Sequence, residues 1–232
     1  MTRRFLAAPL PARGDVITLS QVVSHHVLRV VMVPRGSTLV LFDGQGREAT
    51  GELIGTQDGL AQVRLTEDPR VARPGHALVL VVGLPRKPAW DHGLRMATEL
   101  GATEIRGFPA SRSVGQGGKP ERWTRVVEAA AAQCGRGHVP RVRACPDLAT
   151  ALEDLPDQRL VGVPGVPPTR APRADTALLI GPEGGLTDLE LARARREGFT
   201  PFGLSPWTLR VDTAIAAALA LIGAAHRPGH RS

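Results

Sequence analysis

The segment 178–187 constrains this chain more than any other, because it predicts a strand, a tight turn and a helix in immediate succession. An apolar run ends abruptly at Gly181-Pro182, which is typical of the end of a buried strand. Gly184-Gly185 follows, and without Cβ atoms its backbone groups can approach a ligand closely. Thr187 stands three residues before Glu190, the spacing of a capping box, so we expect a helix to start there.

A strand that passes through a glycine turn into a helix commonly builds a ligand site at the carboxyl end of a sheet. The turn lacks the Gly-Lys-Ser/Thr of a phosphate-binding loop and the glycine spacing of a dinucleotide fingerprint. Neither ATP nor NAD is therefore the expected ligand. A purely structural turn is the alternative interpretation of this segment taken alone.

A second motif lies at 202–214 and contains Leu-Arg-Val-Asp-Thr-Ala. Together the two segments resemble the signature of the SPOUT RNA methyltransferases. More specifically, they resemble the bacterial RsmE family, which methylates N3 of one uridine in 16S ribosomal RNA. The resemblance continues in the family's order over nearly the whole chain, at residues 26–30, 41–44, 87–90, 97–102, 111–114, 122–123, 131–136 and Pro140.

This resemblance implies an α/β fold with two domains. It implies a PUA-like β-barrel that binds RNA at residues 1–70 and a SPOUT methyltransferase domain at 74–232, with a C-terminal segment threaded into a trefoil knot. It also implies S-adenosyl-L-methionine as the cofactor, 16S rRNA or a small-subunit particle as the partner, and a homodimer. Knots break the general rule against threading, and nothing in composition or spacing points to one.

The residue pattern itself also predicts two parts. Up to about residue 70, short strands alternate with turn signals and suggest a small β-barrel, interrupted by a helix near 20–31 with Ser20 as its N-cap. Within that helix, His26 lies on an apolar stripe with Val23 and Val27, so we expect it to be packed. The expected strands are 16–19, 38–42, 47–54 and 60–65, and the expected boundary is 68–75.

From residue 77 onward, strands and helices alternate, which argues for a mainly parallel sheet covered by helices. Two segments, 115–118 and 164–173, are expected to be loops. The expected strands are 77–82, 105–108, 159–163, 177–180 and 199–203, and the expected helices lie near 90–100, 120–134, 148–155, 188–197 and 212–226.

The chain carries 29 basic and 22 acidic residues among 232, a net charge of +7, which favours a polyanionic partner. Only Lys87 and Lys119 are lysines, and a GC-rich coding bias explains the ratio of arginine to lysine better than RNA binding does. Any single arginine is also interpretable as solvated surface charge. As a group, the candidates for RNA contact are Arg3, Arg4, Arg29, Arg112, Arg122 and Arg136.

Other features exclude several classes of protein. Cys134 and Cys145 form no metal-ligand pattern, so we expect no metal and a reducing compartment. Aromatic residues make up 3% of the chain and tyrosine is absent, so a broad aromatic platform for RNA bases is excluded. The N-terminus lacks the apolar core of a signal peptide, and no apolar run is long enough to span a bilayer, so we expect a cytoplasmic protein.

The resemblance places the cofactor in a cradle formed by the two motifs, mostly through backbone groups. At Gly184 we expect a side chain to fill the space that the cofactor occupies. The small alanines of the last helix would keep the crowded knot passable, although helix propensity explains them equally well. The candidate cofactor residues are Ile180, Gly181, Glu183, Gly184, Gly203, Leu204, Leu209 and Ala214.

Arg210, Asp212 and Glu183 are the candidate catalytic residues. Arg210 could hold a phosphate or polarise a uracil carbonyl, or it could form an ion pair with Glu183 or Asp212. The family usually has glutamate at the position of Asp212, so a direct proton-acceptor role for this residue is less secure. Ala132 likewise replaces a usual glutamate, which weakens a catalytic role for its helix.

Two rival functions are consistent with the resemblance. One is a SPOUT enzyme that methylates another RNA position. The other is a catalytically silent RNA-binding factor for ribosome assembly, which need not bind S-adenosylmethionine.

Overall fold

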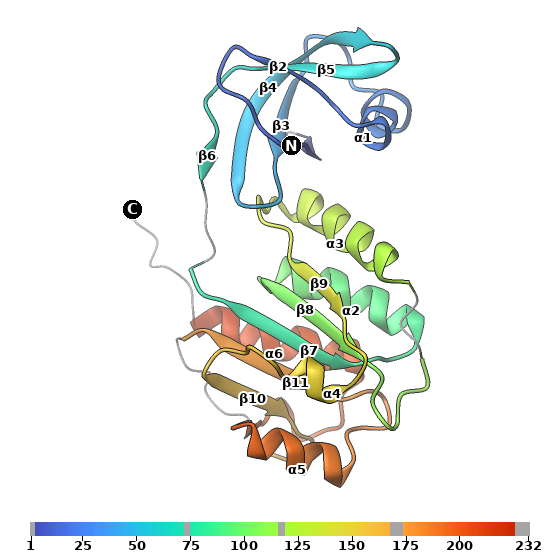
Figure 1. The fold of residues 1–232 in the computed structure, drawn as a ribbon, viewed down its shortest axis with the longest axis vertical. Coiled ribbons are helices and arrows are strands. Elements are labelled where there is room, and N and C mark those ends of the chain that lie inside the picture. Colours follow the sequence, from blue (N-terminus) through green and yellow to red (C-terminus); the bar gives the residue numbers. More distant parts are fainter. Residues whose placement is uncertain (1–2, 72–74, 116–118, 168–173, 226–232) are drawn as a thin grey trace. The chain divides into compact units, whose positions relative to one another are not determined.

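The computed structural model describes residues 3–71, 75–115, 119–167 and 174–225. It divides into two compact units (Figure 1). Unit 1 comprises residues 1–73 and 128–139, and unit 2 comprises residues 74–127 and 140–232. The division therefore falls inside helix α3 (Pro120–Cys134), whose last turns are grouped with unit 1. Our expectations for 116–118, 168–173 and 226 lie outside the described residues.

Unit 1 is built on a six-stranded sheet in the order β1-β3-β4-β5-β2, with β6 paired to β4. The pairs β3–β4, β4–β5, β2–β5 and β4–β6 are antiparallel, whereas β1 runs parallel to β3. The segment 137–139 joins this unit through Gly46 N–H to Gly137 O and Val139 N–H to Gly44 O. The strands are β1 (Arg4–Leu6), β2 (Val16–Thr18), β3 (Thr38–Phe42), β4 (Arg47–Gln57), β5 (Leu60–Leu65) and β6 (Arg70–Val71).

The helix of unit 1 differs from the expectation in its geometry. Ser20 caps α1 (Gln21–His25) as predicted, by accepting from Val23 N–H, but the chain then widens into a π-helix at His26–Val30. The buried face of this helical segment is centred on Ser24 and Val27. Val27 is buried as expected, but His26 is exposed, with its ring edge-on to Phe5.

A buried serine anchors this helix to the sheet instead. Ser24 is 1% exposed, and its hydroxyl donates to Leu19 O and accepts from Ala61 N–H. A hydroxyl satisfied in both roles can be buried at little net cost.

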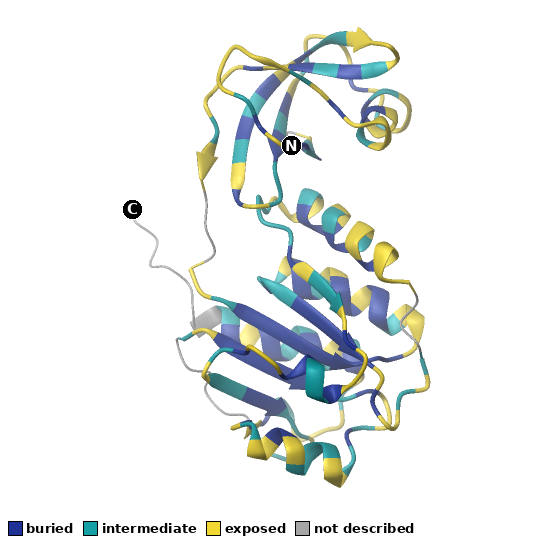
Figure 2. Cartoon of the chain, in the orientation of Figure 1, coloured by how far each residue is buried: buried dark blue, intermediate teal, exposed yellow. Residues whose placement is uncertain are grey.

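Unit 2 contains a second six-stranded sheet, ordered β12-β10-β11-β7-β8-β9, in which every described pairing is parallel. All residues of β7 and β11 are buried, as expected for central strands covered on both faces (Figure 2). The strands are β7 (Leu78–Gly83), β8 (Glu104–Phe108), β9 (Arg141–Ala144), β10 (Gln158–Gly162), β11 (Thr176–Ile180) and β12 (Thr200–Phe202).

The two faces of this sheet are covered by different helices. Alternate residues of the central strands, among them Val79, Val81 and Leu179, pack in one cluster with residues of α4 (Leu148–Ala151) and α5 (Asp188–Arg196). Helices α2 (Lys87–Glu99) and α6 (Val211–Ala225) pack against each other, and α6 contacts β11. The alternation expected from the sequence therefore forms a parallel sheet between helical layers.

Several boundaries differ from the expectations. Helix α2 begins at Lys87 rather than near Trp90, because Pro88 is accommodated in its first turn, where no N–H partner is needed. The short strands β1, β6 and β9 were not predicted. In the part of the chain that the structure describes, no helix is long and apolar enough to cross a membrane.

Arg106 on β8 is a buried arginine, 2% exposed, and it closes the end of α4. Its Nε donates to Glu104 Oε1 at 2.7 Å, and its guanidinium also donates to the carbonyl oxygens of Ala151, Glu153 and Asp154. These carbonyls follow the end of the helix, where intrahelical donors have run out. Arg106 thus stabilises the face opposite α2 and α6.

We predict that Arg106→Met lowers the free energy of unfolding by roughly 2–4 kcal/mol, because it leaves Glu104 and the three carbonyls without their donor. Arg143→Met is the matched control, since Arg143 approaches the same Glu104 at 3.6 Å but is one-third exposed. Urea denaturation of both variants measures the difference. Equal losses in the two variants would contradict the role of Arg106.

Candidate functional site

A cavity of about 350 Å³ lies at the carboxyl ends of β10 and β11 in unit 2. Its walls are mainly apolar, and its polar groups are largely those of the backbone of glycine-rich turns. The lining residues come from three segments of the chain and from α5. The first two segments are Gly162–Pro164 and Ile180–Leu186. The third contributes Leu204, Ser205, Trp207–Leu209, Val211 and Ala214, and α5 contributes Leu191.

Seven of the eight candidate cofactor residues line this one cavity. The exception is Gly203, which lies against the backbone of Val166 and Pro167 and does not line the cavity. The sequence analysis did not select Gly162–Pro164, Leu191 or Val211, although all of them line the cavity. Gly162–Pro164 follows a parallel strand that neighbours β11, and this adjacency was the signal that could have selected it.

The turn at 181–187 is fixed to the loop that follows β7. The Glu183 carboxylate accepts from Arg86 N–H at 2.9 Å, at the start of α2. A Cβ atom on Gly83 would lie 2.7 Å from Pro182 Cδ and 2.9 Å from Ala110 Cβ, so the ends of β7, β8 and β11 meet here without space for a side chain. Glu183 therefore lines the cavity and also positions the turn.

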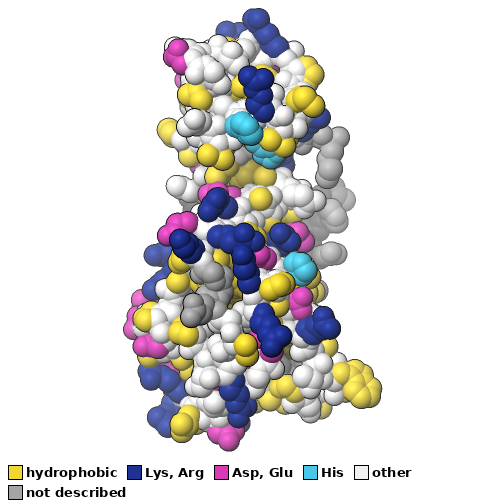
Figure 3. Space-filling view, turned by 90° about the vertical axis from the view of Figure 1, so that its right-hand side faces the viewer, with side chains coloured by type: hydrophobic (Ala, Val, Ile, Leu, Met, Phe, Trp, Pro, Cys, Tyr) yellow, Lys and Arg dark blue, Asp and Glu magenta, His cyan; other side chains and the backbone are white. Residues whose placement is uncertain are grey.

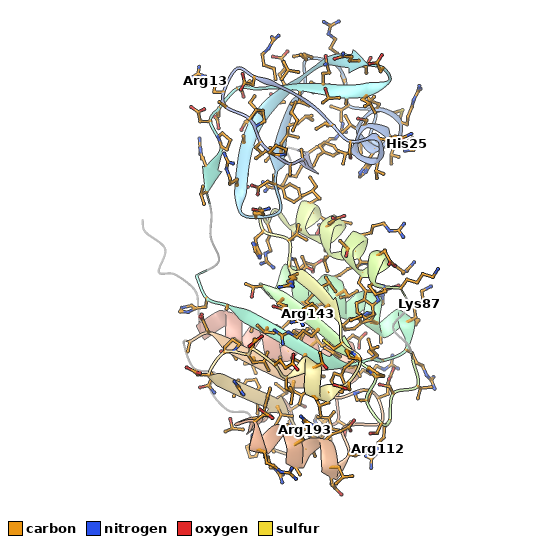
Figure 4. The ribbon with its side chains drawn as sticks, in the orientation of Figure 1. Arg13, His25, Lys87, Arg112, Arg143 and Arg193 are labelled. Atoms are coloured by element: carbon orange, nitrogen blue, oxygen red, sulfur yellow. The ribbon has the colours of Figure 1, made fainter. Side chains whose placement is uncertain are left out.

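The same turn is fixed to the loop that follows β8. Arg112 donates to Gly184 O at 3.2 Å, and both Lys87 and Arg112 lie at the edge where the strands of unit 2 end (Figure 4). A Cβ atom on Gly184 would lie 2.9 Å from Arg112 Cβ. The expectation that a side chain at Gly184 fills the ligand space was therefore wrong, because the space belongs to Arg112.

Glu190 carries the predicted capping box and extends it. One carboxylate oxygen accepts from Thr187 N–H at 2.7 Å and from Thr187 Oγ1 at 2.9 Å. The other accepts from Ser111 N–H at 2.8 Å and Ser111 Oγ at 3.1 Å. Burial alone would raise the pKa of Glu190, but these four hydrogen bonds outweigh burial and lower it. One carboxylate thus joins the start of α5 to the loop after β8.

Gly203 lies where two loops pass each other. A Cβ atom on this residue would overlap the carbonyl oxygens of Val166 and Pro167. Gly181 is similarly crowded, since its Cβ would lie 2.9 Å from Leu186 N. The glycines of both motifs therefore permit close packing of backbone on backbone, and the cavity is shaped by this packing.

The three candidate catalytic residues are not brought into one cluster. Arg210 is exposed, and neither of the expected ion pairs with Glu183 or Asp212 is present among the described residues. Asp212 lies in the first turn of α6, with one carboxylate oxygen 3.7 Å from His92 Nδ1 on α2. Val211 and Ala214 line the cavity, whereas Arg210 and Asp212 do not.

The six arginine candidates for RNA contact differ in their surroundings. Arg3 and Arg29 are exposed, and Arg112 is exposed but bonded to Gly184. Arg4 donates to Glu48 at 2.6 Å and lies 5.6 Å from the centroid of the Phe42 ring. Arg122 donates to Asp91, which raises its pKa, and burial lowers the pKa of Arg136. Of these six candidates, Arg3 and Arg29 are therefore exposed and without a guanidinium partner among the described residues.

Several Lys and Arg side chains lie near one another on the face drawn in Figure 3, with Asp and Glu side chains among them. Among the described residues of unit 2, the exposed cations around the cavity motifs are Arg86, Lys87, Arg112 and Arg210. No group of three or more potential metal ligands occurs in the described ranges. The site is thus an apolar cavity, with Arg112 bonded to its lining at Gly184 and Arg210 between the lining residues Leu209 and Val211.

Comparisons with known proteins agree with this arrangement. The family model described as an RNA methyltransferase domain matches residues 73–223. The ribosomal RNA small subunit methyltransferase E of Synechocystis is 30% identical, over 97% of this chain and 78% of that protein. This chain belongs to the ribosomal RNA small subunit methyltransferase E family. The enzyme of the same name from Bacillus subtilis is 28% identical, over 85% of this chain and 86% of its own length.

Solved structures of similar proteins have the same fold as this methyltransferase family member. A Neisseria gonorrhoeae ribosomal RNA small subunit methyltransferase E bound to S-adenosyl methionine aligns with a TM-score of 0.85 and 26% identity, covering 95% of this chain and 96% of that one. A Legionella pneumophila protein described as a methyltransferase, solved with its cofactor SAM, gives 0.88 and 26%, covering 97% and 98%.

We predict that Glu190→Gln lowers the free energy of unfolding by about 2 kcal/mol at pH 7, because an amide cannot accept all four hydrogen bonds. Since the pKa of Glu190 is lowered by folding, its contribution is complete above the unfolded pKa and is lost as the pH falls through the folded pKa. The difference between wild type and variant should therefore be constant from pH 7 to about 5 and shrink below about 4.5.

Urea denaturation across this pH range measures that difference. Glu99→Gln, at an exposed position on α2, is the control and should remain within about 0.5 kcal/mol of wild type. A pH-independent difference for Glu190→Gln would contradict the role of the carboxylate charge.

A second prediction concerns the crossing of the two loops. Gly203→Ala should lower the free energy of unfolding by roughly 1–3 kcal/mol, because the new methyl group overlaps two backbone carbonyls. Gly75→Ala, where a Cβ atom meets nothing within 4 Å, is the matched control. Thermal unfolding of both variants tests this, and an unchanged melting temperature for Gly203→Ala would show that the crossing is loose.

Proposed function

We propose that this protein methylates N3 of a specific uridine in 16S ribosomal RNA of the small subunit, with S-adenosyl-L-methionine as the methyl donor. Family membership and the cavity built from both sequence motifs support this proposal. The names of the Synechocystis and Bacillus subtilis relatives specify small-subunit ribosomal RNA and a methyltransferase activity. The choice of uridine N3 comes from the resemblance to the RsmE family alone.

The residues present fit S-adenosylmethionine. The cavity offers apolar walls from Ile180, Leu186, Leu204 and Leu209 for an adenine ring, and it offers backbone groups of the turn at 181–185 for polar atoms. When bound, the cofactor supplies an electrophilic methyl group on a sulfonium. No metal is required for that transfer.

The protein must then handle the proton of uridine N3, which is a poor nucleophile while it is protonated. Arg210 adjoins cavity-lining Leu209 and Val211, and its guanidinium is free of the expected carboxylate partners in the described structure. It is therefore available to stabilise negative charge that develops on the uracil carbonyl oxygens, or to hold a phosphate. Asp212 with His92, 3.7 Å apart, is the neighbouring pair able to orient a proton acceptor.

The architecture proposed from the resemblance completes this picture. Residues 1–70 would form a PUA-like barrel that contacts RNA, with Arg3 and Arg29 as its candidate contacts. Residues 74–232 would form a SPOUT domain with a trefoil knot. The functional assembly would be a homodimer, which light scattering can test.

Nucleoside mass spectrometry of ribosomal RNA from a strain that lacks this gene tests the proposed reaction. We expect N3-methyluridine to disappear from 16S rRNA and to return when the gene is restored. A different missing nucleoside would favour another SPOUT activity. An unchanged profile, together with no binding of S-adenosylmethionine in calorimetry, would favour an assembly factor.

We predict that Arg210→Lys reduces single-turnover methyl transfer by about tenfold to a thousandfold while the melting temperature stays within about 2 °C of wild type. Lysine keeps the charge but loses the planar fork that arginine offers to a carbonyl or phosphate. Arg193→Lys, at an exposed position on α5, is the control and should transfer at the wild-type rate. A variant that is unstable but fully active per folded molecule would remove Arg210 from the site.

A further inference from the structure

Trp207 stands apart from every other phenylalanine and tryptophan of this chain. The sequence contains five phenylalanines, three tryptophans and no tyrosine. All five phenylalanines, Trp90 and Trp123 are buried, whereas Trp207 is 77% exposed. Single exposed apolar residues are common on protein surfaces, so the exposure of Trp207 is informative because this residue also lines a cavity.

The position of this ring is also informative. Trp207 lines the cavity formed by the two motifs, between Ser205 and Thr208, which line it as well. Most of its surface nevertheless faces solvent, beyond the cavity interior formed by Ile180, Leu186 and Val211. Because residue 207 lines the cavity and is mostly exposed, it lies at the mouth of the cavity, where a ligand that is larger than the cavity must pass.

A short turn constrains the backbone around Trp207. Trp207 N–H donates to Ser205 Oγ at 3.1 Å, which closes a short turn around Pro206. Proline fixes one backbone dihedral angle, and the serine hydroxyl replaces a backbone acceptor in this turn. This turn restricts the backbone of residues 205–207, so binding through Trp207 orders less backbone than binding through an unrestrained loop.

The surrounding charges indicate which ligand the ring serves. Arg210 and Arg112 are exposed, Arg210 adjoins two cavity residues, and Arg112 donates to Gly184 at the cavity. Proteins hold single nucleotides with aromatic rings that stack on the base and cations that bind phosphate, and Trp207, Arg112 and Arg210 all line or adjoin the lining of this one cavity.

We infer that Trp207 is the residue on which the target base stacks when it enters the cavity. This inference rests on the proposed function. A uridine that reacts at N3 presents the edge of its ring to the methyl donor, so it must leave its own base stack and its face must be covered by the protein. Trp207 supplies that cover at the mouth, and it thereby selects an unstacked base over a paired one.

Three variants test the inference by single-turnover methyl transfer, with saturating S-adenosylmethionine and rRNA from cells that lack this gene. Trp207→Ala should raise the half-saturating RNA concentration by about 5- to 100-fold, the usual range for loss of one base stack. Trp207→Phe should stay within about threefold, because a ring remains. Leu189→Ala, a truncation on α5 at a residue that is 82% exposed and outside the cavity lining, should match wild type.

Calorimetry and light scattering separate the other roles that the ring could have. We expect the Kd for S-adenosylmethionine and the molar mass in solution to be the same in all four proteins. A weaker Kd for the cofactor in Trp207→Ala, with RNA saturation unchanged, would assign the ring to the cofactor. A lower molar mass in that variant would assign it to an interface between copies. Either result would overturn the inference.

A fluorescence measurement decides the question independently of the reaction. Because Trp90 and Trp123 are buried, acrylamide quenching of tryptophan emission reports mainly on Trp207. Saturating RNA should reduce this quenching in wild type and Leu189→Ala but leave the residual emission of Trp207→Phe unaffected. Unchanged quenching in RNA-saturated wild type contradicts the inference even if the methylated atom proves to be other than uridine N3.

Discussion

The Glu190 carboxylate is the interaction on which the geometry of the site depends. It accepts four hydrogen bonds, two from Thr187 at the start of α5 and two from Ser111 after β8. The turn at 181–187 ends at Thr187. Near the start of this turn, the Glu183 carboxylate accepts a hydrogen bond from Arg86 N–H. Two acidic side chains therefore hold a glycine-rich turn whose own sequence would allow many conformations.

This arrangement explains why the cavity can be mostly apolar and still be well defined. Its shape comes from backbone packing at Gly181 and Gly203 and from hydrogen bonds outside its walls. The side chains of the rim, among them Arg210 and Trp207, are then free to meet a substrate. Structural and substrate-directed tasks are thus divided between residues that lie only a few positions apart.

The sequence predicted features whose chemistry is local. The capping box of Thr187 and Glu190, the cap at Ser20 and the central strands of unit 2 depend on neighbouring residues, and each is present in the structure. Seven of the eight candidate cofactor residues line one cavity, four from the first motif and three from the second, and their role in holding the cofactor stays a prediction. Local chemistry did not reveal the second partner of Glu190, since Ser111 is 79 residues away.

The errors have the same origin. Strand β1 pairs in parallel with β3 over three residues, and no local pattern specifies such a short, distant pairing. His26 was assigned to the apolar stripe, but the buried face of its helix is centred on Ser24 and Val27, and a serine gives no apolar signal in the sequence. Gly184 was assigned to the ligand because the sequence cannot reveal that Arg112 occupies the space beside it.

The strand order of unit 2 has a consequence for synthesis on the ribosome. β7 is fully buried and pairs with β11, which emerges nearly a hundred residues later, after β8 and β9 have formed on the other side. Until residue 180 leaves the exit tunnel, the nascent chain carries a bare apolar strand edge, the kind of surface that invites pairing with other chains. We therefore expect a chaperone to cover this edge, or rapid synthesis to shorten its exposure, until β11 pairs with β7 and the cavity forms.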